Sequence, residues 1–228
     1  MFDPSCWRYH VRVWLLRLPG VYRPQADTRL LLSALRDARL GHSARALDLC
    51  TGTGVAAIAA AREGAGRVTA VDRYLPAVLS ARFNARVRGL PVRVLHGDLS
   101  AVEGQFDLIT ANPPYVPCPS LEPAQGAALA WDAGLDGREC LDTLCERAAD
   151  LLAPNGTMLI VHSALCGVSQ TLESLRDKGL KSSVVARALE PFGPVMRERV
   201  EYLESSGLIE PGERTEELVV IRADRIER

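Results

Sequence analysis

Short apolar segments alternate with longer amphipathic segments along most of this 228-residue sequence. This alternation restricts the fold strongly, because parallel strands of one sheet need a crossover of a dozen or more residues, usually a helix, between them. Seven segments have the length and apolar content of strands: residues 45–50, 67–72, 92–98, 106–114, 157–162, 182–189 and 217–223. The sequence therefore predicts an α/β fold, with a doubly wound, mostly parallel seven-stranded sheet covered by helices on both faces.

The segments between these strands have apolar residues at the spacing of one helix face. Helices are expected at residues 55–63, 76–89, 136–152 and 168–179. Another helix is expected soon after Pro24, with Asp27 or Thr28 as its capping residue. Residues 9–16 form a candidate for one additional strand.

Nothing in the composition divides the chain, so residues 21–228 are expected to form one domain after an extension of residues 1–20. One segment departs from the alternation. Residues 191–213 lie between the last two expected strands and have the character of an inserted helix flanked by Pro and Gly. Its amphipathic pattern favours packing against the domain, although a cover over the substrate or a dimer contact would use the same pattern.

The charge balance restricts the partners. The chain has 27 Lys and Arg against 28 Asp and Glu, a formal net charge of −1. Proteins that bind nucleic acid or anionic membranes along their surface need an excess of basic charge. We therefore expect neither partner, and the sequence has no apolar run of about 18 residues that would span a membrane.

The cysteines and histidines argue against a metal site. The six cysteines form no C-x-x-C pair, and the four histidines are far apart in the sequence. Small, scattered cysteines of this kind are typical of a reducing compartment. The apolar stretch near the N-terminus is interrupted by arginines and no cleavage site follows it, so we expect no signal peptide and a cytoplasmic protein.

Three of the expected strands carry an aspartate at or near the carboxyl end: Asp48, Asp72 and Asp98. Open α/β sheets bind ligands at this edge. Gly52 and Gly54 follow the first of these strands, and they allow a tight turn and a close approach of ligand to backbone. The turn therefore resembles a nucleotide-binding site.

The turn fits S-adenosylmethionine (SAM) better than a dinucleotide such as NAD. Ala57 stands where the dinucleotide signature G-x-G-x-x-G has its third glycine. Asp48 enters the turn, where a carboxylate would repel a pyrophosphate but attract an ammonium or sulfonium group. Asp72 is placed to accept hydrogen bonds from the two hydroxyls of a ribose.

The fourth expected strand ends in Asn112-Pro113-Pro114-Tyr115, at the same edge of the sheet. The side-chain carbonyl of Asn112 and the backbone carbonyl of Pro113 can accept the two N–H bonds of an amide or aromatic amine. Such a clamp would aim the nitrogen lone pair at a methyl donor, while Tyr115 offers a flat face to the acceptor. An Asn before Pro also forms ordinary turns, which is the structural alternative.

These motifs resemble those of the class I SAM-dependent methyltransferases with an N-P-P-Y signature, and among them the HemK type of protein-glutamine N5-methyltransferase. The resemblance extends to residues 21–28, Val-Tyr-Arg-Pro-Gln-Ala-Asp-Thr, and to residues 131–139, Trp-Asp-Ala-Gly-Leu-Asp-Gly-Arg-Glu. It implies a Rossmann-like fold and a SAM site. The residues implied in cofactor binding are Thr28, Asp48, Cys50 through its backbone, Asp72, Asp98, Leu99 and Asn112.

The resemblance also implies an acceptor: a glutamine side chain of a protein, of the kind found in the Gly-Gly-Gln loop of release factors. Long bacterial members have an N-terminal helical domain, for which residues 1–20 are too few. The chain is more similar to the short branch, which in eukaryotes works with a small zinc-binding activator subunit.

Three alternatives remain open. A small-molecule amine or amide would suit the same clamp, and the extra helix and the absent docking domain favour it. Adenine N6-methylation would also suit the clamp, but it needs a basic groove that the net charge of −1 does not favour. A SAM-binding scaffold without catalysis would leave the intact N-P-P-Y signature unexplained.

Overall fold

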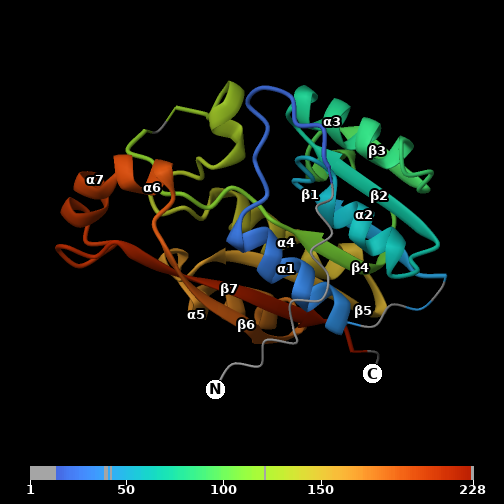
Figure 1. Cartoon of the computed structure of the whole chain (residues 1–228). Coiled ribbons are helices and arrows are strands. Elements are labelled where there is room, and N and C mark those ends of the chain that lie inside the picture. The colour runs from blue at the N-terminus through green and yellow to red at the C-terminus, as the bar shows by residue number, and fades with distance from the viewer. Residues whose placement is uncertain (1–13, 39–40, 42, 121, 227–228) are drawn as a thin grey trace, which may run out of the picture.

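The computed structural model describes residues 14–38, 41, 43–120 and 122–226. Within these residues seven strands form one sheet in the order β3-β2-β1-β4-β5-β7-β6 (Figure 1). The strands are β1 (Arg45–Leu49), β2 (Arg67–Asp72), β3 (Val92–His96), β4 (Phe106–Ala111), β5 (Leu152–Ser163), β6 (Lys181–Pro191) and β7 (Thr215–Asp224). All pairings from β3 to β5 are parallel, and β7 runs antiparallel to both of its neighbours. The predicted doubly wound, mostly parallel sheet is confirmed.

The helices cover the two faces of the sheet in two separate groups. One core cluster joins the sheet to α1 (Ala26–Asp37), α2 (Val55–Arg62) and α3 (Leu75–Arg86). The other joins it to α4 (Glu139–Leu151) and α5 (Val168–Asp177). The central strands are buried on both sides, which is why they appear in the sequence as nearly continuous apolar runs.

The chain order reverses between β1 and β4, which are neighbours in the middle of the sheet. From β1 the chain continues through β2 to the β3 edge, and then returns to β4 on the other side of β1. At such a reversal the connections leave in opposite directions and open a crevice at the carboxyl ends of the strands. Asp48 in β1 and Asn112, directly after β4, lie at this crevice.

One local expectation near the N-terminus is wrong, and another is covered only in part by the described residues. Of the strand expected at residues 9–16, residues 9–13 lie outside the described part of the chain, and residues 14–16 form no strand. The Asn84 side chain of α3 takes the place of a strand partner: its Oδ1 accepts from the Leu16 N–H at 2.8 Å, and its Nδ2 donates to the Leu16 carbonyl at 2.9 Å. Helix α1 begins at Ala26 after Gln25, so neither Asp27 nor Thr28 caps it.

The segment between β6 and β7 forms two short helices, α6 (Pro194–Glu198) and α7 (Val200–Ser205), where one helix was expected. The break is at Arg199, whose guanidinium forms an ion pair with Asp132 and donates to the Pro117 carbonyl at 2.9 Å. A small cluster packs the two helices against the loop after β4: Val116, Phe192, Met196, Leu203 and Ile209. Residues 191–213 therefore pack against the domain as expected, and the loop after β4 is the part that they contact.

Among the described residues, no helix combines the length and the apolar character that crossing a bilayer requires.

Candidate active site

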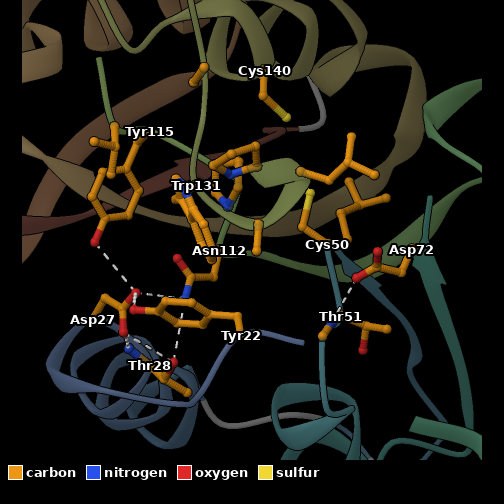
Figure 2. Close-up of a pocket in the computed structure, with 18 of the residues that line it drawn as sticks. Tyr22, Asp27, Thr28, Cys50, Thr51, Asp72, Asn112, Tyr115, Trp131 and Cys140 are labelled. Atoms are coloured by element: carbon orange, nitrogen blue, oxygen red, sulfur yellow. Dashed lines mark hydrogen bonds between the residues drawn. The ribbon is translucent and has the colours of Figure 1, made fainter. Parts of the chain in front are cut away.

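A cavity of about 1230 Å³ opens at the carboxyl edge of the sheet. Its wall is built from α1, the β1–α2 turn, the ends of β2 and β4, and the ends of β6 and β7 (Figure 2). Ten of the residues that the sequence predicts for the site line it: Thr28, Asp48, Cys50, Gly52, Asp72, Asp98, Leu99, Asn112, Pro113 and Tyr115. Gly54 is the predicted residue outside this wall.

Asp48 lies beneath the β1–α2 turn and is only 3% exposed. Its carboxylate accepts hydrogen bonds from the Thr51 hydroxyl at 2.6 Å, the Thr110 hydroxyl at 2.7 Å and the Ala57 backbone N–H at 3.1 Å. Burial raises the pKa of Asp48 to about 6, although these hydrogen bonds lower it in part. Asp48 therefore ties the turn to β4 and places a negative charge directly below it.

The turn needs left-handed backbone at several positions. Gly52 has φ +54° and Gly54 has φ +82°, while Cys50 has φ 55° although it carries a side chain. A Cβ at Gly54 would lie 3.0 Å from the Ala81 side chain of α3, so this glycine allows α2 and α3 to pack closely. A Cβ at Gly52 would meet nothing within 4 Å, because this glycine faces open space at the cavity.

Asp72, at the end of β2, lines the cavity and is bonded directly to the β1–α2 turn (Figure 2). Its two carboxylate oxygens accept one backbone N–H each, from Gly52 at 2.8 Å and from Tyr74 at 2.9 Å. Burial raises the pKa of Asp72, while these two bonds lower it. Each oxygen has two lone pairs, so the carboxylate can still accept hydrogen bonds from two ligand hydroxyls.

Asp98 and Leu99 lie at the outer end of the same cavity. The exposed Asp98 carboxylate accepts from the Ser100 backbone N–H at 2.8 Å and begins a short 3₁₀ turn, η2 (Leu99–Ala101). Hydrogen bonds from Ser100 lower the pKa of Asp98. Leu99 is half-buried beside it and offers an apolar surface.

The Asn112 side chain is held from below by α1. Its Nδ2 donates to Oδ2 of Asp27 at 3.0 Å, and it also lies 3.4 Å from the Thr28 hydroxyl (Figure 2). A carboxylate can only accept hydrogen bonds, because it has no hydrogen atom to donate. The amide nitrogen of Asn112, which is the donor end of the side chain, must therefore face Asp27. Its side-chain carbonyl is thereby turned away from α1 and left available to a ligand.

Asp27 is the residue that the sequence reasoning missed, since it considered this side chain only as a helix cap. It is 2% exposed and accepts hydrogen bonds from the hydroxyls of Tyr22 at 2.8 Å and Tyr115 at 3.4 Å. Burial and the charge of Asp27 raise the pKa of both tyrosines, so both remain neutral donors. The signal was available: Asp27 lies within residues 21–28, the segment already associated with the site.

The loop at 131–139 supports the N-P-P-Y segment from the other side. Val116 donates its N–H to the Trp131 carbonyl at 2.8 Å, and Trp131 lines the cavity. At Gly137, an added Cβ would lie 2.4 Å from the Tyr115 carbonyl. The two segments therefore pack backbone against backbone, and Trp131 both anchors its loop and contributes to the wall of the site.

Comparison with known proteins assigns this site to a family. A family model described as the methyltransferase small domain matches residues 12–129. A putative protein N5-glutamine methyltransferase of Methanocaldococcus jannaschii is 35% identical over 180 residues, which cover 78% of this chain and 90% of that protein. The chain belongs to the HemK family of SAM-dependent methyltransferases.

Other members of the HemK family differ in length. The release factor glutamine methyltransferase of Mycolicibacterium smegmatis is 33% identical over 74% of this chain, but the match covers 63% of that protein. The structure of the Mtq2–Trm112 complex of E. cuniculi matches 90% of this chain and 99% of that chain, with a TM-score of 0.60 and 21% identity. That match shows the shared class I methyltransferase fold.

The residues of this HemK-family chain fit SAM. Open space beside Gly52 lets a ligand reach the backbone, and Asp72 has lone pairs left for a ribose. The buried charge of Asp48 favours a cation above it and disfavours a pyrophosphate. The prediction of SAM over a dinucleotide is confirmed by the family to which the chain belongs.

Proposed function

We propose that this enzyme methylates the side-chain amide nitrogen of a glutamine in a protein. The observation that carries the proposal is the hydrogen bond from Asn112 to Asp27, because it leaves the Asn112 carbonyl as an acceptor at the cavity. The backbone carbonyl of Pro113, next in the chain, is the second acceptor. The names of the relatives support glutamine as the acceptor residue.

The chemical problem is the weak nucleophilicity of an amide nitrogen, whose lone pair is delocalised into its carbonyl. The carbonyl oxygens of Asn112 and Pro113 would accept hydrogen bonds from the two N–H groups of the amide. These bonds would turn the NH₂ group so that its lone pair points across the cavity. The same carbonyl dipoles would stabilise the positive charge that develops on nitrogen. Tyr115 would hold the flat face of the amide. After the transfer the nitrogen would lose one proton to solvent and the thioether S-adenosylhomocysteine would leave, so no side chain needs to act as a general base. SAM supplies the methyl group.

We assign the cofactor to the side of the cavity formed by β1, β2 and β3. Asp72 would accept hydrogen bonds from the ribose hydroxyls, with the Cys50 and Gly52 backbone beside it. Asp48 would stabilise the cofactor's positive charge from below the turn. Further contacts on this side are proposed for Thr28, Asp98 and Leu99.

Methyl transfer to a Gly-Gly-Gln peptide and to a whole release factor tests this function. With labelled SAM we expect incorporation into one or both, and none into a matched Gly-Gly-Glu peptide. Asn112→Ala serves as the inactive control. Absence of label in both substrates would reject the proposal. Incorporation into a small amine, or into adenine of nucleic acid, would instead identify one of the alternative acceptors.

A small activator subunit stays a prediction for this chain. One surface favours it: α3 and the residue that caps it expose a stripe of four apolar side chains at a spacing of four residues, Leu75, Leu79 and Phe83 in the helix and Val87 at its C-cap. Exposed apolar stripes of this kind are typical of protein contacts. Co-expression with a small subunit of the Trm112 type, with Phe83→Glu as the comparison, would test it. A cytoplasmic location also stays a prediction.

A further inference from the structure

Two glutamates face each other at the ends of β6 and β7. Glu190 and Glu216 are directly paired in the register of these antiparallel strands. Both line the cavity of the proposed active site. Like charges placed directly opposite each other on neighbouring strands are destabilising, so this pair needs a physical reason.

Of the two, Glu216 is in the less favourable environment for a charged group. It is 8% exposed, and its Oε2 has no hydrogen-bond partner among the described residues. Burial raises the pKa of Glu216, and the charges of Asp27 and Glu190 raise it further, while a hydrogen bond from Ser163 lowers it. A buried carboxylate oxygen without a partner costs free energy that a ligand can recover.

The protein itself does not neutralise this pair. In the parts of the chain that the structure describes, no ion pair includes Glu190 or Glu216. The next acidic residue, Glu217, points to the other face of β7 and forms an ion pair with Arg187. The two glutamates at the cavity therefore lack the kind of partner that their neighbour has.

The strand order places the glutamates on the acceptor side of Asn112. Along the sheet the order is β2, β1, β4, β5, β7 and β6, so Asp72 and Asp48 lie on one side of Asn112 and the glutamates on the other. Neighbouring strands are about 4.8 Å apart, and β7 is two strands from β4. Glu216 is thus about 10 Å from the Asn112 strand, and Glu190, one strand further, is about 14 Å from it. These distances are the length of about three to four residues of extended chain.

We propose that Glu190 and Glu216 form an acidic subsite that binds a Lys or Arg side chain of the acceptor protein, within about four residues of the methylated glutamine. This subsite rests on the proposed function for its glutamine acceptor. A neutral N–H donor would satisfy Oε2 of Glu216 but would leave the repulsion between the two carboxylates. A cation would bind Oε2 of Glu216 and would also reduce the repulsion between the two carboxylates.

The α6–α7 segment gives the subsite its rigid frame. It begins directly after Glu190 and Pro191, and its Phe192 and Met196 pack against Val116 of the loop after β4. The ends of β6 and β7 are thereby fixed relative to the N-P-P-Y segment. The inserted helices would accordingly hold a specificity site in addition to packing against the loop.

The subsite is tested with two glutamine peptides of otherwise identical sequence. One has a Lys and the other a norleucine at the same position near the glutamine. For the native enzyme we expect KM to be about tenfold lower with the Lys peptide, with similar kcat. Glu216→Gln and Glu190→Gln should each reduce this preference to within about twofold, with SAM affinity unchanged. Glu217→Gln is the matched control and should keep the preference. Equal KM values for both peptides, or a preference that survives Glu216→Gln, would overturn the subsite.

A binding measurement separates this proposal from the proposed function. N-acetyl-arginine amide is titrated into the enzyme with S-adenosylhomocysteine present and followed by NMR. Binding that Glu216→Gln abolishes would support the subsite even if no glutamine peptide is methylated. Glutamine methylation without probe binding and without a Lys preference would keep the function and reject the subsite. Thermal unfolding checks the fold, and we expect Glu216→Gln to melt no lower than the native chain.

Discussion

The side-chain nitrogen of Asn112 lies 3.0 Å from a carboxylate oxygen of Asp27, a residue that is 85 positions earlier in the chain. Because Asp27 is buried and accepts hydrogen bonds from two tyrosine hydroxyls as well, its orientation is fixed. It can bind only the NH₂ end of the Asn112 amide. The clamp of the proposed mechanism therefore depends on a residue that does not itself need to touch the acceptor.

Asp27→Asn should lower kcat by about tenfold to a hundredfold, since an amide at this position also lets Asn112 bind in the flipped orientation. The Kd of SAM should remain within about threefold, which a general loss of structure would not allow. Steady-state kinetics and calorimetric titration measure the two quantities. Tyr22→Phe is the control, because it removes one bond to Asp27 but keeps the carboxylate. Unchanged turnover in Asp27→Asn would contradict the positioning role.

Asn112→Ala should lower turnover by on the order of a hundredfold or more, because it removes one of the two acceptors that orient the amide. SAM should still bind, since the cofactor side of the cavity is formed by other strands. Labelled methyl transfer and calorimetry on the same preparation separate these effects. A variant that loses SAM binding and turnover together would show that Asn112 acts on the cofactor rather than on the acceptor.

Asp72→Ala should weaken SAM binding by about 1–3 kcal/mol, roughly 5- to 150-fold in Kd, through the loss of charge-assisted hydrogen bonds. Part of this loss comes from the turn, because Asp72 also accepts the Gly52 N–H. Asp72→Asn keeps one acceptor oxygen and should lose less. The Kd values come from calorimetric titration, and a Kd within twofold of the native value in Asp72→Ala would refute the ribose contact.

SAM affinity should fall as the pH is lowered through about 6. Burial raises the pKa of Asp48 to about 6, so the carboxyl is mostly protonated at pH 5. A bound cation favours the ionised form, and binding must therefore release this proton. The expected loss of affinity between pH 7.5 and pH 5 is about tenfold. Titrations in two buffers of different ionisation enthalpy detect the proton, and Asp48→Asn should remove most of the effect.

His162 should make the fold less stable in mild acid. Burial lowers the pKa of His162 to about 4 from its ordinary value of 6.5, so the folded chain holds the ring neutral. The unfolded chain takes up the proton as the pH falls below 6.5. The stabilising contribution is thus complete above pH 6.5 and is lost as the pH falls towards 4, with about 2 kcal/mol lost by pH 5.

Urea unfolding at pH 7.5 and pH 5 measures this loss, and the comparison is with His162→Gln. The variant isolates the histidine, because the raised pKa values of buried acids such as Asp48 act in the opposite direction. His96→Gln makes the same substitution at an exposed histidine and serves as the comparison variant. A native chain and a His162→Gln chain with parallel pH profiles would exclude this role.

Most of the fold was predictable from the sequence, for a physical reason. Buried parallel strands are apolar on both faces, so the central strands β1 and β4 appear as nearly continuous apolar runs, and helical spacing separates the strands along the chain. The failures are local. Residues 14–16 form no strand, and the backbone N–H and carbonyl of Leu16 bind the Asn84 side chain instead of a strand. Helices α6 and α7 are separated at Arg199, which forms an ion pair with Asp132. Both partners are distant in the chain and invisible to a local pattern.

The order of residues along the chain determined the fold class and which polar groups meet at one edge of the sheet, because parallel strands all end at that edge. The amino-acid sequence alone therefore sufficed to place Asp48, Asp72 and Asn112 together. Only the tertiary structure decided which way the Asn112 amide points and that Glu190 lies opposite Glu216. Both depend on contacts between segments that are separated in sequence, and those contacts arise only when α1 packs on the sheet and β6 pairs with β7.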